Sequence, residues 1–190
     1  MDKTKLKTLI ASLLKTVGSI PKVKLAKLVL FAEIEHFRMT DESYTGLYFV
    51  RLRKGPVVAF FDDILEEETG NIWEKKTSLV PIFEEGMKKV QYSYSLIKDI
   101  DIPEELQKTI KTVNSAYSKK SGSKLSTLSH NLPAWKYSEP NEPIYIAELA
   151  IKKDAEYFNL IDLIEDIDEE DDELLSEKIS QYIPTTEGKI

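Results

Sequence analysis

The stretch Lys24-Leu-Ala-Lys-Leu-Val-Leu-Phe-Ala-Glu-Ile-Glu-His-Phe-Arg38 decides the fold of this chain. Its apolar residues cover more than half of the circumference of a helix, a pattern that is typical of helices packed on several sides. Pro21 precedes the stretch, and proline is tolerated in the first turn of a helix because its missing N–H has no partner there. The sequence therefore predicts a central core helix that Pro21 opens.

A second, amphipathic helix is predicted before this central helix. Between Leu6 and Val17, apolar residues recur at spacings of three and four, which places them on one helical face. Gly18 follows, and glycine readily takes the left-handed conformation in which many helices end. We expect the two helices to be joined by a short turn at Gly18.

Strand patterns follow the central helix. Branched and aromatic side chains favour strands, and they predict three of them: Leu47 to Leu52, Ser78 to Phe83 and Lys89 to Leu96. Gly55-Pro56 ends the first, and the other two form a hairpin around Glu85-Gly86. Within this hairpin, Pro81 places its strand at a sheet edge, while Tyr92 and Tyr94 share one face.

Helical patterns account for most of the remaining chain. They are predicted at Phe60 to Glu68, Pro103 to Ser118, Leu125 to His130, Tyr145 to Ile151 and Ala155 to Ile167. Ser121-Gly-Ser123 is predicted to be a loop, and Tyr117 to be buried with the apolar residues of its helix. The fold class is therefore α+β and mostly α-helical: a compact helical domain with a small antiparallel sheet inserted after the second helix.

Length and composition favour one domain. The chain has 190 residues, of which 42% are hydrophobic, and this suffices for a single core. We expect that domain to occupy residues 1–161 and an acidic C-terminal helical tail to occupy residues 162–190. The chain has no cysteine, no apolar run long enough to cross a bilayer and no pattern typical of a secretory leader, so a cytoplasmic protein is expected.

The net charge of −7 conceals a polarity along the chain. Residues 1–58 carry eleven Lys and Arg against five Asp and Glu, a net charge of +6, so the remainder carries −13. From Asp162 to Glu177 there are ten acidic residues and no basic one. This acidic run is either a solvated helical tail or an arm that engages a basic partner, and the basic first third leaves nucleic-acid binding possible.

Few side chains could carry a reaction. Glu33 and His36 form an E-x-x-H pair as in dimetal helix bundles, but such sites need two pairs. Thr127 stands three positions before His130, so the second pair is missing. Ser129 beside His130 does not predict a catalytic triad, which requires spatial convergence and an oxyanion hole. We expect no catalytic residue, no metal, no cofactor and no enzymatic activity.

Aromatic and basic residues gather in and around the first predicted strand. One interpretation is that one strand face is core and the basic residues are a solvent rim. The other is an exposed contact surface, because Tyr and Arg concentrate at interface hot spots. On this second interpretation the predicted partner-binding residues are Tyr44, Tyr48, Arg51, Arg53 and Lys54.

A third segment, Leu128-Ser-His-Asn-Leu-Pro-Ala-Trp135, completes the set of motifs. Trp135 is expected to close over the core, with its indole N–H donating to a backbone carbonyl. Together with the central helix, Thr45-Gly-Leu-Tyr-Phe-Val50 and Gly55-Pro-Val57, this segment resembles the Panacea family of SocA-like antitoxins. The resemblance spans roughly residues 6–151.

The matching positions are mostly apolar residues or glycine. They are Leu25, Lys27, Leu28, Phe31, Ala32, Glu33, His36, Thr45, Gly46, Val50, Gly55, Pro56, Val57, Leu128, Ser129, His130, Pro133, Ala134 and Trp135. The chain departs from the family at Leu30, where a tyrosine is usual, and at Arg53-Lys54, where Pro-His usually precedes Gly-Pro-Val. Framework roles are therefore expected for most of the shared positions.

The resemblance implies an antitoxin that neutralises a cognate toxin protein by direct protein–protein binding. Two alternatives remain open. One is a winged-helix-like DNA-binding regulator in which Lys22, Lys24 and Lys27 meet phosphates, and the other is a proteolytic adaptor. No membrane partner is expected.

Overall fold

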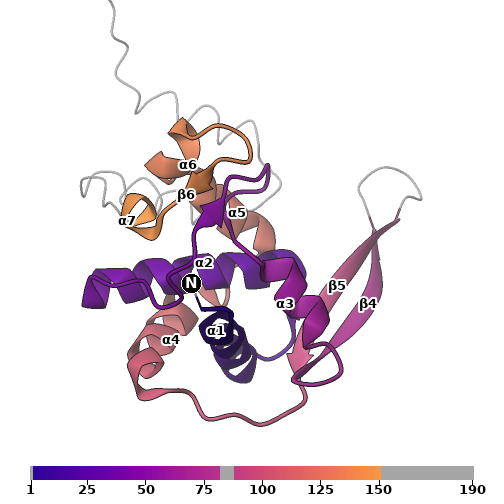
Figure 1. Ribbon diagram of the computed structural model, residues 1–190. Helices are drawn as coiled ribbons and strands as arrows, with labels where there is room; N and C mark the ends of the chain where they lie inside the picture. Colours follow the sequence, from indigo (N-terminus) through magenta and orange to yellow (C-terminus); the bar gives the residue numbers. More distant parts are fainter. Residues whose placement is uncertain (1, 82–87, 151–190) are drawn as a thin grey trace, which may run out of the picture. The chain divides into compact units, whose positions relative to one another are not determined.

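The computed structural model describes residues 2–81 and 88–150 (Figure 1). The predicted turn at Glu85-Gly86, the predicted helix from Ala155 to Ile167 and the acidic segment 162–190 lie outside the described residues. The domain boundary at residue 161 therefore stays a prediction. All of the described residues belong to one compact unit, Met1–Ile151.

Helix α2 (Lys22–Thr40) is the central element, as the sequence predicts. It buries every residue from Leu25 to Ile34, and it contacts helices α1 (Lys3–Val17), α4 (Glu104–Tyr117), α5 (Gly122–His130) and α7 (Ile146–Leu149). Figure 1 shows these helices grouped around it. Pro21 lies just outside α2, at the N-cap position, and also pairs in a short strand.

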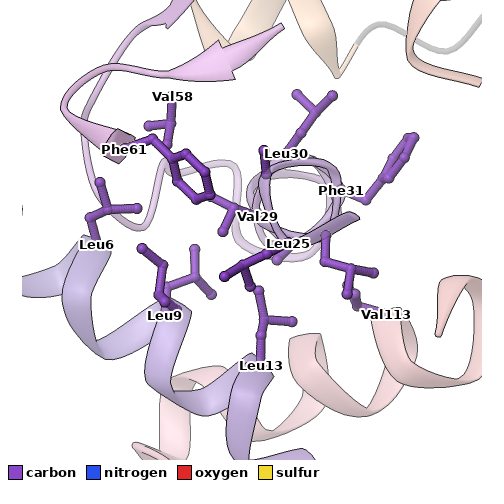
Figure 2. Packing of buried hydrophobic residues seen from close by; sticks show 14 of the residues in the cluster. Leu6, Leu9, Leu13, Leu25, Val29, Leu30, Phe31, Val58, Phe61 and Val113 are labelled. Carbon is purple, nitrogen blue, oxygen red and sulfur yellow. The ribbon is translucent and has the colours of Figure 1, made fainter. Parts of the chain in front are cut away.

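Helix α1 packs its apolar face onto α2, and the predicted amphipathic helix is confirmed. Figure 2 shows Leu9 and Leu13 of α1 directed toward Leu25 of α2. Asp2 caps the first turn by accepting a hydrogen bond from the Thr4 N–H at 2.9 Å. Gly18 ends the helix with a φ of +89°, in the region that glycine adopts at little cost.

The predicted hairpin is confirmed, and it begins earlier than the sequence suggests. Strand β4 (Trp73–Pro81) pairs with β5 (Lys88–Leu96), and β5 also pairs with β1 (Ile20–Pro21), in the order β1-β5-β4. Pro81 therefore lies on an edge strand, as predicted. Tyr94 is fully buried while Tyr92 is 39% exposed, because the outer half of the hairpin extends past the core (Figure 1).

A second antiparallel sheet makes two sheets where one was predicted. Its order is β3 (Val57–Val58), β2 (Phe49–Val50) and β6 (Pro143–Ile144). The strand predicted over residues 47–52 is only two residues long, and its partner β6 comes from far along the chain. Helix α3 (Phe61–Glu67) follows β3 where a short helix is predicted.

The C-terminal helices contain one wrong prediction. α4 has the predicted bounds within two residues, with Tyr117 partly buried and stacked on Phe31 at 4.5 Å between ring centroids. Ser121-Gly-Ser123 is not a loop: the Ser121 hydroxyl accepts a hydrogen bond from the Lys124 N–H at 3.1 Å and caps α5, which begins at Gly122. Helix α6 (Pro133–Tyr137) was not predicted.

Candidate functional site

Lys27 marks the point where the shared motifs meet. It lies on α2, and its side chain is 1% exposed. Its ammonium donates a hydrogen bond to the Pro56 carbonyl at 2.8 Å. Burial lowers the pKa of Lys27 to about 7, because a charged amine loses its hydration in the interior. Lys27 therefore joins the central helix to the turn before β3.

Gly55 lies close to the Lys27 ammonium. Its φ is +92°, which only glycine adopts freely, and a Cβ there would overlap Ser129 Oγ and lie 2.8 Å from Lys27 Nζ. The Ser129 side chain is itself fully buried and donates to the Ser126 carbonyl at 2.8 Å. Three motifs far apart in the sequence thus converge on one closely packed point.

Trp135 extends this convergence toward the surface. Its ring stacks on His130, with centroids 4.1 Å apart and an interplanar angle of 16°. The Arg51 guanidinium lies 4.6 Å from the indole centroid in a cation–π contact, and Arg51 Nε donates to the Trp135 carbonyl at 3.1 Å. The indole N–H donates to the Leu52 carbonyl at 3.0 Å, which confirms the predicted backbone partner. We call Lys27, Gly55, Ser129, His130 and Trp135 the motif junction.

His130 is enclosed in this junction. Burial lowers the pKa of His130, and the nearby positive charges of Lys27 and Arg51 lower it further, against the opposing effect of the Arg53 and Lys54 backbone. Its Nε2 is enclosed and has no hydrogen-bond partner among the residues that the structure describes. Stacked on the indole of Trp135, the imidazole of His130 serves packing.

Glu33 and His36 have structural partners of their own. The Glu33 carboxylate accepts hydrogen bonds from the Ser43 hydroxyl at 3.0 Å and from the Tyr44 and Thr45 N–H groups at 3.2 and 3.0 Å. It therefore fixes the loop that leads from α2 to β2. His36 Nδ1 lies 3.3 Å from Thr109 Oγ1 of α4. Within residues 2–81 and 88–150, no group of three or more His, Cys, Asp or Glu side chains could hold a metal ion.

The five predicted partner-binding residues differ in their exposure. Tyr44 is 5% exposed and packs edge-on against His36, so the expectation that it is exposed is wrong. Burial raises the pKa of Tyr44 to about 12. Tyr48 and Arg51 are half-buried, and Arg51 is engaged by Trp135. Only Arg53 and Lys54 are well exposed.

Arg53 and Lys54 border a pocket that sequence reasoning did not identify. Its volume is about 520 Å³, and it lies between the start of α2, the turn before β3 and the start of α3. Val23 and Phe60, 38% and 37% exposed, contribute apolar surface to it. In the sequence, only Val23 could have indicated this pocket, because it is an apolar residue between Lys22 and Lys24. Since α2 is apolar on most sides, that pattern does not distinguish an exposed valine from a buried one.

The cations invoked for DNA binding have other roles. Lys27 is buried in the motif junction, so the expectation that it meets phosphates is wrong. Lys24 donates to the Ser118 carbonyl at 2.6 Å, and Lys22 pairs with Asp62 at 3.1 Å. All three lysines that were predicted to meet phosphates are therefore either buried or engaged by other groups of the protein. In the part of the chain that the structure describes, no helix combines the length and apolar character needed to cross a membrane.

Comparison with known proteins gives one match. A family model described as antitoxin SocA-like, Panacea domain, matches residues 25–136, which is more than half of the chain. The matched range begins in α2 and ends in α6, so it contains the entire motif junction. No curated protein and no solved structure matches the chain.

Proposed function

The chain belongs to the Panacea-domain family of SocA-like antitoxins, and from this membership we propose that it neutralises a cognate toxin in the cytoplasm by direct, stoichiometric protein–protein binding. The observation that carries the proposal is the family match, which covers the motif junction from Lys27 to Trp135. The toxin is a protein whose gene is expected to neighbour this one.

The use of polar groups in the junction supports binding rather than catalysis. Lys27 and Ser129, the two groups with nucleophilic potential, both donate to backbone carbonyls. Catalytic nucleophiles need an adjacent base and an accessible reacting position. Here both side chains are buried beside Gly55, where three chain segments meet. A rigid, closely packed framework is what a stoichiometric binder needs to keep a contact surface pre-organised.

The contact surface is proposed to include Arg53 and Lys54, with Tyr48 and Arg51 contributing at its edge. Arg53 and Lys54 precede Gly55, so the junction fixes the backbone that presents them. Exposed cations on a fixed turn speed up encounter with an oppositely charged partner and select against a like-charged one.

The test is co-expression of this chain with the product of the neighbouring small open reading frame. Growth should arrest with that product alone and recover when the chain is supplied in at least equal amount. Native mass spectrometry of the co-purified proteins should give a complex of fixed stoichiometry. Recovery at a small fraction of the toxin concentration, or recovery without a complex, would contradict stoichiometric binding and favour catalysis or proteolytic delivery.

A further inference from the structure

Two pockets share lining residues at the first turn of α2. The pocket of about 520 Å³ beside Arg53 and Lys54 shares Lys22, Val23 and Lys54 with a second pocket of about 680 Å³. The second lies between the start of α2, strand β5 and the start of α5. We call the two together the α2 groove.

We propose that the α2 groove binds an acidic amphipathic segment of the toxin, one in which carboxylates flank large apolar side chains. This inference rests on the proposed function, since it assigns the segment to the toxin. It names the chemistry that the surface recognises, and it follows from the apolar residues and the charges that the groove presents.

Exposed apolar side chains gather in the groove. Among the residues that the structure describes, nine large hydrophobic side chains are exposed, and five of them line the α2 groove. They are Val23, Leu52, Phe60, Val90 and Tyr92, with exposures between 37% and 52%. Contiguous exposed apolar surface with a polar rim is typical of protein–protein contact sites. Such side chains supply the desolvated anchor that affinity requires.

The rim of the groove is basic. Arg53, Lys54 and Lys89 form no ion pair within residues 2–81 and 88–150, so their charges face solvent. The acidic residues that line the groove are Asp62 and Asp63, and Asp62 already pairs with Lys22. The rim therefore carries an excess of positive charge. A bound segment with carboxylates beside its apolar anchors would complement it.

A nucleic acid fits this surface less well than a protein does. Phosphates would meet the lysines, but Val23, Leu52 and Val90 are aliphatic and offer no flat ring on which a base can stack. The two aromatic rings of the groove already carry a cation on one face, because Lys3 Nζ lies 4.1 Å from the Phe60 centroid and Lys75 Nζ lies 4.6 Å from the Tyr92 centroid. Burying such side chains against an apolar segment removes them from water, which phosphates and sugars do not achieve. The combination of a mostly aliphatic apolar surface and a cationic rim therefore favours an acidic peptide.

The test uses random twelve-residue peptides displayed on phage and the full chain. Selection on wild type, with counter-selection on the groove variant Val23→Asp/Lys54→Glu, should enrich peptides that combine Asp or Glu with Leu, Ile or Phe. Synthetic versions should bind the groove variant at least tenfold more weakly. The matched control Ile97→Asp/Lys98→Glu alters an exposed apolar–lysine pair outside the groove and should bind like wild type. Thermal unfolding confirms that both variants fold.

Every other outcome overturns the inference. Enriched peptides without acidic residues, equal binding to the groove variant, or binding of single-stranded DNA in place of peptides would each do so. If amide substitution of Glu169, Glu170, Asp171 and Asp172 strengthens peptide binding, the chain's own acidic segment is the occupant. Because the selection needs no toxin, its failure can be distinguished from failure of the proposed function. A groove variant that still rescues cells would contradict the role of the groove but not the neutralisation of a toxin. Selected peptides should also displace the toxin, and peptides that do not displace it contradict the assignment.

Discussion

Val23 and Lys27 lie four residues apart on α2, yet one is 38% exposed and the other 1% exposed. Lys27 also borders the groove, but its side chain is buried in the motif junction, where its ammonium donates to the Pro56 carbonyl. Val23 belongs to the α2 groove, where side chains meet solvent. All five junction residues belong to the shared motifs, whereas Val23, Val90 and Tyr92 lie outside those motifs. The comparison teaches that adjacent turns of one helix can carry a residue of the shared framework and a residue of the surface that we propose contacts the partner.

The two regions should respond oppositely to substitution. In the junction, Gly55, Ser129 and Lys27 leave no room for an added atom, so a small change must move backbone or break a buried hydrogen bond. In the groove, an added or removed atom meets water. We therefore expect junction variants to lose stability, and groove variants to lose binding while keeping their stability.

The largest effect is expected for Gly55→Ala. The new Cβ overlaps Ser129 Oγ, approaches Lys27 Nζ and forces a non-glycine residue to a φ of +92°. Urea unfolding should show a loss of about 4 kcal/mol or more. Gly18→Ala is the matched control, because Gly18 has a φ of +89° and nothing within 4 Å of an added Cβ. It should lose only the backbone cost of about 1–3 kcal/mol.

The difference between these two variants isolates the packing at the junction. Adding Ser129→Ala to Gly55→Ala should restore part of the lost stability, because it removes the oxygen that the new Cβ overlaps. If Gly55→Ala and Gly18→Ala lose equal free energy of unfolding, the backbone conformation alone explains why glycine is needed at Gly55. The junction would then not be closely packed.

The sequence predicts the individual elements of the fold better than it predicts which of them contact one another. Helical periodicity locates α1, α2 and α4 because each has a buried face of regular spacing. Strand β2 is shorter than its pattern suggests, because its pairing partners β3 and β6 are two residues long. Short strands of this kind are defined by pairing across the fold, which local sequence does not contain.

The candidate site shows the same limit. Trp135 has the predicted backbone partner, but Tyr44 lies in the core because Glu33 holds the backbone of its loop against α2. The groove was missed because Val23, Leu52 and Val90 come from three separate elements, and each alone resembles an ordinary core residue. Exposure of an apolar side chain depends on what the rest of the chain leaves uncovered.

A smaller effect, dependent on pH, is expected from Lys27. Its pKa is near 10.5 in the unfolded chain and about 7 in the folded one. Between these values the unfolded state binds more protons, so the free energy of unfolding should rise with pH by about 1.4 kcal/mol per pH unit. This contribution is lowest below pH 7 and complete above pH 10.5. Urea unfolding at pH 7.5, 8.5 and 9.5 measures the slope.

Lys27→Met should flatten that slope, because it removes the buried amine while keeping much of its volume. Lys76→Met is the control, since the Lys76 side chain is 63% exposed, and it should leave the slope unchanged. A Lys27→Met variant with the wild-type slope would show that Lys27 stays protonated in the folded protein and that its contact with the Pro56 carbonyl outweighs its burial.

The smallest effect on stability is expected in the groove, for Arg53→Gln/Lys54→Gln. Both side chains are exposed and form no ion pair among the described residues, so the free energy of unfolding should change by less than about 0.5 kcal/mol. Their charges act at a distance on an approaching partner. Association with the toxin should therefore slow several-fold at low salt and much less at high salt, since salt screens exposed charges.

Binding kinetics at two salt concentrations, together with urea unfolding, decide whether Arg53 and Lys54 act in the groove or in the junction. Glutamine keeps the approximate length of both side chains and removes only their charge, so apolar contacts of the groove are retained. If the variant unfolds more easily by over 1 kcal/mol, the turn before Gly55 belongs to the junction and not to the groove. If the toxin associates at the wild-type rate at low salt, these cations do not face it, and the anchor must lie on another surface of the chain.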